Sequence, residues 1–121
     1  MNNDDIVQEQ KAMCRKYGSD FVASDFDLKI GVALETLKSE PITGLRSELR
    51  GDTAGWYIWG GEFSDAPDFF QSLCVHHLDV ICAGAMKYLG LAPGFGFIFD
   101  HRGYEDVWND PERLERERKT E

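Results

Sequence analysis

The densest group of side chains that could perform chemistry lies between residues 74 and 82. It contains two cysteines, two histidines and an aspartate: Cys74, His76, His77, Asp79 and Cys82. A structural zinc site needs four ligands that converge tetrahedrally, and adjacent histidines on one segment generally point apart. The sequence has no second cluster that would complete the set. We therefore predict no metal site here, and we expect one histidine to pack or hydrogen-bond near the start of a helix while the other faces solvent.

A cysteine nucleophile with a histidine base is the other chemistry that this segment allows. Its members would be Cys74 or Cys82 with His76, His77 or His101. The reaction requires an exposed thiol of lowered pKa, whereas free cysteine is among the most buried residue types. Cys82 lies on a predicted apolar stripe and no nucleophile motif surrounds Cys74. We therefore predict inert thiols.

The sequence also lacks disulfide and cofactor signatures. The cysteines number 3 and no pair has C-x-x-C spacing, which indicates reduced thiols rather than a disulfide framework or a zinc ribbon. The glycines at 60–61 and 94–96 lack the spacing of a dinucleotide or phosphate loop. We predict no catalytic residue, no cofactor and no metal.

Charge is the clearest indication of a partner. The chain has 22 acidic and 13 basic residues and a net charge of -9 at pH 7, which disfavours nucleic acid and anionic membranes. A protein with a basic surface is the natural complement, although an acidic surface can also serve solubility alone. The partner-binding residues that we predict are carboxylates in loops bordering a sheet: Glu62, Asp65, Asp68, Glu105 and Asp106.

These side chains need a scaffold, and the stretch G-W-Y-I-W-G-G-E at 55–62 predicts its centre. We expect a central strand at 55–60 that ends in a glycine pair. Side chains alternate along a strand, so Trp56 and Ile58 share one face, and Tyr57 and Trp59 share the other. A run that is apolar on both faces predicts burial on both.

Two helices are expected to pack against this sheet. One lies near 4–17 and is capped by Asn3 or Asp4, and the other lies near 78–89, where apolar residues recur at three and four and Gly90 can cap the end. The remaining elements are strands at 30–34, 95–99 and 104–108, turns at 41–46 and 100–103, and a charged tail or short helix at 109–121. Arg46, in the 41–46 turn, is interpreted as a structural ion-pair anchor.

The fold class that these elements predict is α+β, with a small and mostly antiparallel sheet. A chain of 121 residues fits one domain, 1–121, that can bury a core without disulfides or metals. The N-terminus lacks the basic and apolar regions of a signal peptide, and no window approaches the apolar length of a membrane span. We expect a cytoplasmic protein.

Six short motifs, taken in order, resemble one family. They are I-G-V-A at 30–33, P-I-T-G-L-R at 41–46, G-W-Y-I-W-G-G-E at 55–62, D-F-F-Q-S-L at 68–73, K-Y-L-G-L-A-P-G at 87–94 and Y-E-D-V-W at 104–108. As a series over residues 20 to 110 they resemble the Imm33-like family of small bacterial immunity proteins. The resemblance implies a cytoplasmic α+β protein, not an enzyme, that binds and neutralises a cognate toxin. Thr43, Cys74 and Gly96 depart from the family pattern, and no catalytic residue is carried over.

Two other function classes compete with this hypothesis. One is a small metal-dependent hydrolase that uses the Cys/His/Asp cluster at 74–82, which metal analysis of the purified protein would reveal. The other is a ligand-sensing domain, which requires an aromatic pocket beside Trp56 and Trp59. We favour the toxin-binding hypothesis because it agrees with the resemblance, the acidic composition and the lack of a catalytic motif.

Overall fold

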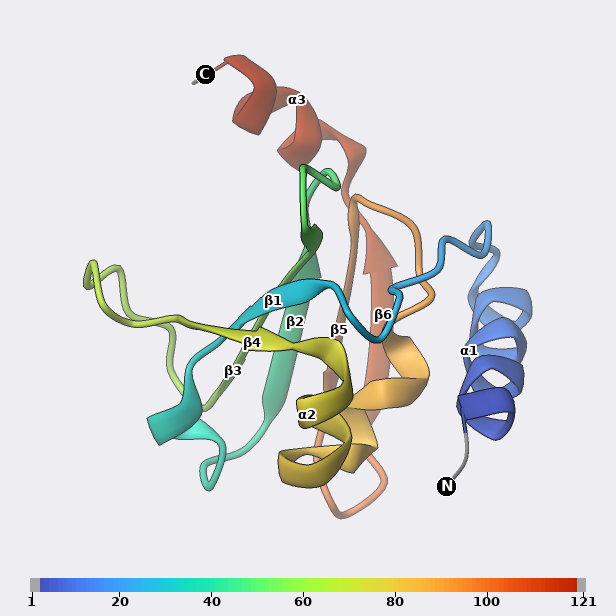
Figure 1. Ribbon diagram of the computed structural model, residues 1–121, viewed down its shortest axis with the longest axis horizontal. Helices are drawn as coiled ribbons and strands as arrows, with labels where there is room; N and C mark the ends of the chain where they lie inside the picture. The colour runs from blue at the N-terminus through green and yellow to red at the C-terminus, as the bar shows by residue number, and fades with distance from the viewer. Residues whose placement is uncertain (1–2, 120–121) are drawn as a thin grey trace.

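The chain folds into a six-stranded sheet with helices packed against it (Figure 1). The computed structural model describes residues 3–119. The helices are α1 (Asn3–Tyr17), α2 (Val75–Ile81) and α3 (Pro111–Lys119), with two 3-10 helices, η1 (Leu34–Thr36) and η2 (Ala83–Tyr88). The strands are β1 (Lys29–Val32), β2 (Ile42–Arg46), β3 (Thr53–Gly60), β4 (Gln71–Cys74), β5 (Phe95–Phe99) and β6 (Glu105–Asn109).

The strand order is β4-β1-β3-β2-β5-β6, so β3 lies inside the sheet as predicted. Neighbouring strands are antiparallel except β1 and β3, which run parallel. The predicted α+β class and mostly antiparallel sheet are therefore confirmed. Within residues 3–119 no helix is long and apolar enough to cross a membrane.

The side of the sheet that faces α1, α2 and η2, here called the inner face, carries the core. Strand alternation places Trp56, Ile58 and Phe97 on it, and all three are fully buried. Tyr88 of η2 stacks on Phe97 with the ring centroids 4.5 Å apart. Ile6 of α1 belongs to the same buried cluster. The helices thus close the inner face with apolar and aromatic side chains.

The opposite side, here called the outer face, is covered unevenly. Trp59 is only 8% exposed because Phe63 and Phe70 pack against it, whereas Tyr57 is 43% exposed. The predicted burial on both faces is confirmed for Trp59 and wrong for Tyr57. Alternation tells which residues share a face, but it does not tell whether a second layer covers that face.

The turn predicted at 41–46 is wrong, because Ile42–Arg46 form strand β2 between β3 and β5. Gly44 resembles a turn residue in the sequence, yet it serves packing: a Cβ at this position would lie 2.2 Å from the ring of Phe97. Burial alternates along β2 with the two-residue period of a strand that has one covered face. From the sequence alone, a strand glycine that makes room for a ring of the neighbouring strand cannot be told from a glycine in a turn.

The helix predicted at 78–89 is interrupted. α2 ends at Ile81, Cys82 adopts φ -155° and ψ 64°, and η2 begins at Ala83. The interruption leaves Ile81 exposed although it lies on the predicted apolar stripe, whereas Leu78 is fully buried. Apolar residues spaced by three and four fit an α-helix followed by a 3-10 turn as well as one continuous helix.

The strand predicted at 30–34 is shorter than expected. β1 ends at Val32, and Leu34 begins η1. The backbone N–H of Leu34 donates to the side-chain oxygen of Gln71 at 3.0 Å instead of to a neighbouring strand. This side-chain acceptor lets the backbone leave the sheet without losing its hydrogen bond.

Arg46, at the end of β2, crosses the core as a fully buried guanidinium. Its nitrogens donate to the backbone carbonyls of Val22, Ala23, Ala54, Leu89 and Leu91, at distances between 2.6 and 3.3 Å. The guanidinium also lies over the Trp56 ring, 5.6 Å from its centroid. Burial lowers the pKa of Arg46 to about 10, because a charge without bulk water is less stable. The predicted structural role is confirmed, but the partners are carbonyl oxygens rather than a carboxylate.

Replacing Arg46 with lysine tests this anchor. We expect Arg46→Lys to lower the free energy of unfolding by at least about 3 kcal/mol, because one ammonium cannot reach carbonyls on three separate segments and leaves some of them unpaired. Urea unfolding measures the loss. Arg102→Lys, an exposed position in the β5–β6 turn, is the matched control and should change stability by less than about 0.5 kcal/mol. A loss below about 1 kcal/mol at Arg46 would show that a single ammonium satisfies the site.

Candidate partner-binding site

The Cys/His/Asp cluster at 74–82 does not converge on a point. His76 and His77 are both exposed, with their rings 4.2 Å apart, and Nδ1 of His76 lies 3.0 Å from the carbonyl oxygen of Phe26. Within residues 3–119 no group of three or more His, Cys, Asp or Glu side chains could hold a metal ion. The hydrolase alternative therefore has no metal site among the described residues.

Burial protects the thiols of Cys14 and Cys82. Cys82 is half-buried, and burial raises the pKa of its thiol above the ordinary value. Cys14 lies on the buried side of α1 and donates to the carbonyl oxygen of Gly90 at 3.3 Å, and burial raises the pKa of its thiol. Because the thiolate is the reactive form, a raised pKa keeps both thiols unreactive near neutral pH.

The aromatic pocket required by a ligand-sensing domain is not formed by Trp56 and Trp59. Trp56 lies on the inner face, where its indole N–H donates to the carbonyl oxygen of Leu89 at 3.2 Å. Trp59 lies on the outer face beneath Phe63 and Phe70. The two indoles are separated by the sheet itself, so they cannot line one cavity.

The five predicted carboxylates lie at one end of the sheet but on different faces. Ile42 pairs with both Gly60 and Phe99, and Phe99 pairs with Glu105, so the end of β3 and the start of β6 meet at the same sheet end. The loop that follows β3 exposes Glu62, Asp65 and Asp68. Asp106 is exposed on the outer face, whereas Glu105 points to the inner face.

Residues 61–70, here called the aromatic loop, fold over the outer face. The ring centroids of Phe63 and Phe70 lie 5.3 Å and 6.2 Å from that of Trp59. Phe70 also meets Tyr57 edge-on at 5.2 Å, and Phe69 meets Phe70 at 4.9 Å. Edge-to-face contacts of this kind are favourable beyond the area they bury. They hold in place a loop that contains neither helix nor strand.

Phe63 projects from this cluster into solvent. It is 58% exposed, its sequence neighbour Glu62 is exposed, and no lysine or arginine occurs between residues 51 and 86. An exposed aromatic side chain beside carboxylates is typical of an interface anchor with a charged rim. The sequence prediction named the carboxylates but not Phe63, and it expected Tyr57 to be buried, because large apolar residues in or beside a strand normally indicate a covered core.

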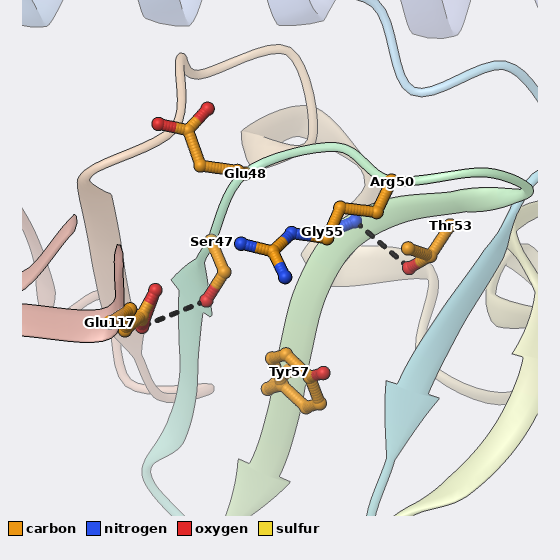
Figure 2. Close-up of a pocket in the computed structure, with 7 residues that line it drawn as sticks. All are labelled: Ser47, Glu48, Arg50, Thr53, Gly55, Tyr57 and Glu117. Atoms are coloured by element: carbon orange, nitrogen blue, oxygen red, sulfur yellow. Dashed lines mark hydrogen bonds between the residues drawn. The ribbon is translucent and has the colours of Figure 1, made fainter. Parts of the chain in front are cut away.

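A pocket of about 320 Å³ opens beside Tyr57, between β3, the β2–β3 loop and α3 (Figure 2). It is lined by Ser47, Glu48, Arg50, Thr53, Gly55, Tyr57 and Glu117. Figure 2 shows the side chain of Arg50 reaching into it above Tyr57. Both carboxylates of the pocket already have partners within the chain. Arg118 binds Glu48, and Arg113 and the Ser47 hydroxyl each donate to Glu117 at 3.0 Å. The pocket is therefore lined by the contacts that attach α3, and it adjoins the outer face at Tyr57.

The carboxylate of Glu105 is engaged in hydrogen bonds within the chain. Lys16 donates to its carboxylate at 2.8 Å, and the hydroxyls of Tyr17 and Tyr88 donate at 2.6 Å, which ties α1 and η2 to β6. Partial burial alone would raise the pKa of Glu105, but the three hydrogen bonds outweigh burial and lower that pKa to about 2. Burial and the bond to Glu105 also raise the pKa of Tyr88. Glu105 is thus an ionised carboxylate whose oxygens face the chain's own donors.

Comparison with known protein families gives a match over most of the chain. A family model for the Imm33-like domain matches residues 9–110, a span that includes all six strands and ends before α3. No curated protein and no solved structure matches the chain.

The Glu105 network predicts a pH dependence of stability. We expect Glu105→Gln to lower the free energy of unfolding at neutral pH by about 1.5 to 3 kcal/mol, the usual worth of hydrogen bonds to a charged group. The pKa of Glu105 in the folded chain is about 2, below its ordinary value of 4.5. Its stabilisation is therefore complete above the ordinary value and is lost as the pH falls toward the folded value. Urea unfolding at neutral pH and at about pH 3 should show the difference between the two proteins shrinking.

Asp106→Asn, at the neighbouring exposed position, is the control for this measurement. It should change stability by less than about 0.5 kcal/mol at either pH. A Glu105→Gln protein as stable as the parent at neutral pH would contradict the assignment.

Proposed function

This chain belongs to the Imm33-like domain family, and on that premise we propose that it is an immunity protein that binds and neutralises a cognate bacterial toxin. It acts by binding rather than by catalysis. It works in the cytoplasm, where its free cysteines at 14, 74 and 82 remain reduced.

The aromatic loop is the observation that carries this proposal. Phe63 and Tyr57 present exposed aromatic surface, and the exposed carboxylates Glu62, Asp65 and Asp68 share one loop with Phe63. Desolvated aromatic side chains supply most of the binding energy in typical protein interfaces, whereas charges at the rim mainly steer the encounter. The surface fits a partner whose contact region is basic at its edge and apolar at its centre.

Asp106 extends this acidic surface along the outer face of β6. Glu105 supports it from the inner face by holding β6 to α1 and η2 through Lys16, Tyr17 and Tyr88. A rigid scaffold with functional residues in its loops keeps the entropic cost of binding low. Neutralisation then follows from occlusion, because a toxin surface covered by this chain cannot contact the toxin's own target.

Charge reversal in the loop tests the proposal. We expect the pair Glu62→Lys and Asp65→Lys to slow association with the purified domain of the cognate toxin, identified from the neighbouring genes, by at least about tenfold at about 0.05 M salt, and to affect dissociation less. The difference should shrink as the salt rises to about 0.5 M, because screening shortens the range of the interaction. Stopped-flow association kinetics measure both effects.

A matched pair on the segment between α1 and β1 controls for net charge. Asp20→Lys with Asp27→Lys changes the charge by the same amount at exposed positions and should slow association less than the loop pair does. If the two pairs slow association equally, only the net charge matters and the loop has no special role. An association rate that neither loop reversal nor salt alters would falsify the acidic-surface proposal.

A further inference from the structure

One row of paired residues crosses the outer face from β1 to β6. Its members are Gly31, Tyr57, Leu45, Gly96 and Trp108. Residues directly opposite one another on neighbouring strands bring their side chains within contact distance. Three large side chains and two glycines therefore share one line across the sheet.

The two glycines make room for the neighbouring rings. A Cβ at Gly31 would lie 2.8 Å from the Tyr57 ring, and a Cβ at Gly96 would lie 2.7 Å from the Trp108 ring and 2.8 Å from Leu45. Tyr57 therefore lies over Gly31, and Trp108 lies over Gly96. The side chains of Tyr57, Leu45 and Trp108 form an apolar strip close to the strands, here called the outer strip.

The polar groups of the outer strip differ from those of the inner-face aromatics. On the inner face, the Trp56 indole donates to Leu89, and the Tyr88 hydroxyl donates to Glu105. In the described part of the chain, neither the Tyr57 hydroxyl nor the Trp108 indole N–H has a hydrogen-bond partner. Aromatic residues with an apolar body and a free polar group are typical of interfaces.

The outer strip is continuous with the aromatic loop, and carboxylates lie beyond both of its ends, while Arg50 lies beside Tyr57. Tyr57 belongs to the strip and also contacts Phe70 of the loop. The loop carboxylates lie beyond one end, and Asp106 lies beside Trp108 at the other. A second copy of this chain, with its net charge of -9, would meet repulsion there, whereas a basic surface would be attracted.

From this arrangement we infer that the bound toxin covers the outer strip as well as the aromatic loop, with Trp108 on β6 as a second anchor. The inference rests on the proposed function and specifies its contact area. The occupant is a protein surface with an apolar centre that reaches from Phe63 to Trp108 and with basic residues that reach Asp106. A partner that contacted the loop alone would leave exposed Tyr57 and partly exposed Leu45 and Trp108 in contact with water.

Affinity measurements with the same purified domain of the cognate toxin test the inference. Trp108→Ala should weaken binding at least about tenfold, as truncation of an anchor does. Trp108→Phe, which keeps an aromatic ring over Gly96, should recover most of that loss. Asp106→Lys should weaken binding several-fold through slower association. Val80→Ala, which truncates an apolar side chain that is 84% exposed on α2, is the matched control and should bind like the parent.

Fluorine NMR of the full chain labelled with fluorotryptophan gives a second readout that tolerates an unstable alanine variant. The Trp108 resonance, assigned with Trp108→Phe, should shift when the toxin domain binds, while the resonance of fully buried Trp56 should stay in place.

The outcomes separate the inference from the proposed function. If the loop reversals weaken binding while Trp108→Ala, Asp106→Lys and the Trp108 resonance show no effect, the proposed function stands and the outer-strip contact is overturned. If the loop and strip variants all bind like the parent and Val80→Ala weakens binding, the toxin occupies the helix side and both proposals fail. Association of the free chain into dimers that Trp108→Ala abolishes would assign the strip to a second copy and overturn the inference.

Discussion

The buried guanidinium of Arg46 is the constraint on which the rest of the structure depends. A fully buried cation is costly unless every donor is satisfied. Here the acceptors come from three places in the chain, namely β3, the segment at 22–23 that precedes β1, and the segment at 89–91 that follows η2. The carbonyls of those connecting segments are satisfied by the same side chain. One residue of β2 therefore fixes how the segments that connect the helices meet the sheet.

This anchoring gives the two faces of the sheet different roles. The inner face is closed: Tyr88 stacks on Phe97, and the polar groups of Trp56, Tyr17 and Tyr88 all find partners within the chain. The outer face keeps Tyr57 and Phe63 in contact with solvent. Because the inner face is closely packed, it can hold exposed aromatic groups in a defined arrangement, which a binding surface requires.

Helix α3 lies beyond the span matched by the Imm33-like family, which ends at residue 110. It is attached mainly by polar contacts: Arg113 donates to the carbonyl oxygen of Arg46 at 2.8 Å, and Arg118 binds Glu48. Figure 1 shows α3 at the end of the sheet away from α2. The attachment begins at the backbone of Arg46, so the residue that organises the core also holds the helix outside the family span.

The sequence by itself determined the central strand at 55–60, the helix near 4–17, the edge strand after the 100–103 turn and the acidic character, because strand alternation, helical apolar spacing and charge are local properties of the sequence. The loop carboxylates of the candidate site could be found in the same way. Only the tertiary structure decided that Gly44 makes room for the Phe97 ring instead of forming a turn, and that Cys82 interrupts the predicted helix. It also decided that Glu105 accepts hydrogen bonds from three donors on the inner face. It also left Tyr57 and Phe63 exposed while it buried Trp59. Those outcomes depend on what lies across the sheet from each residue, and neighbours that are distant in the sequence leave no trace in local spacing.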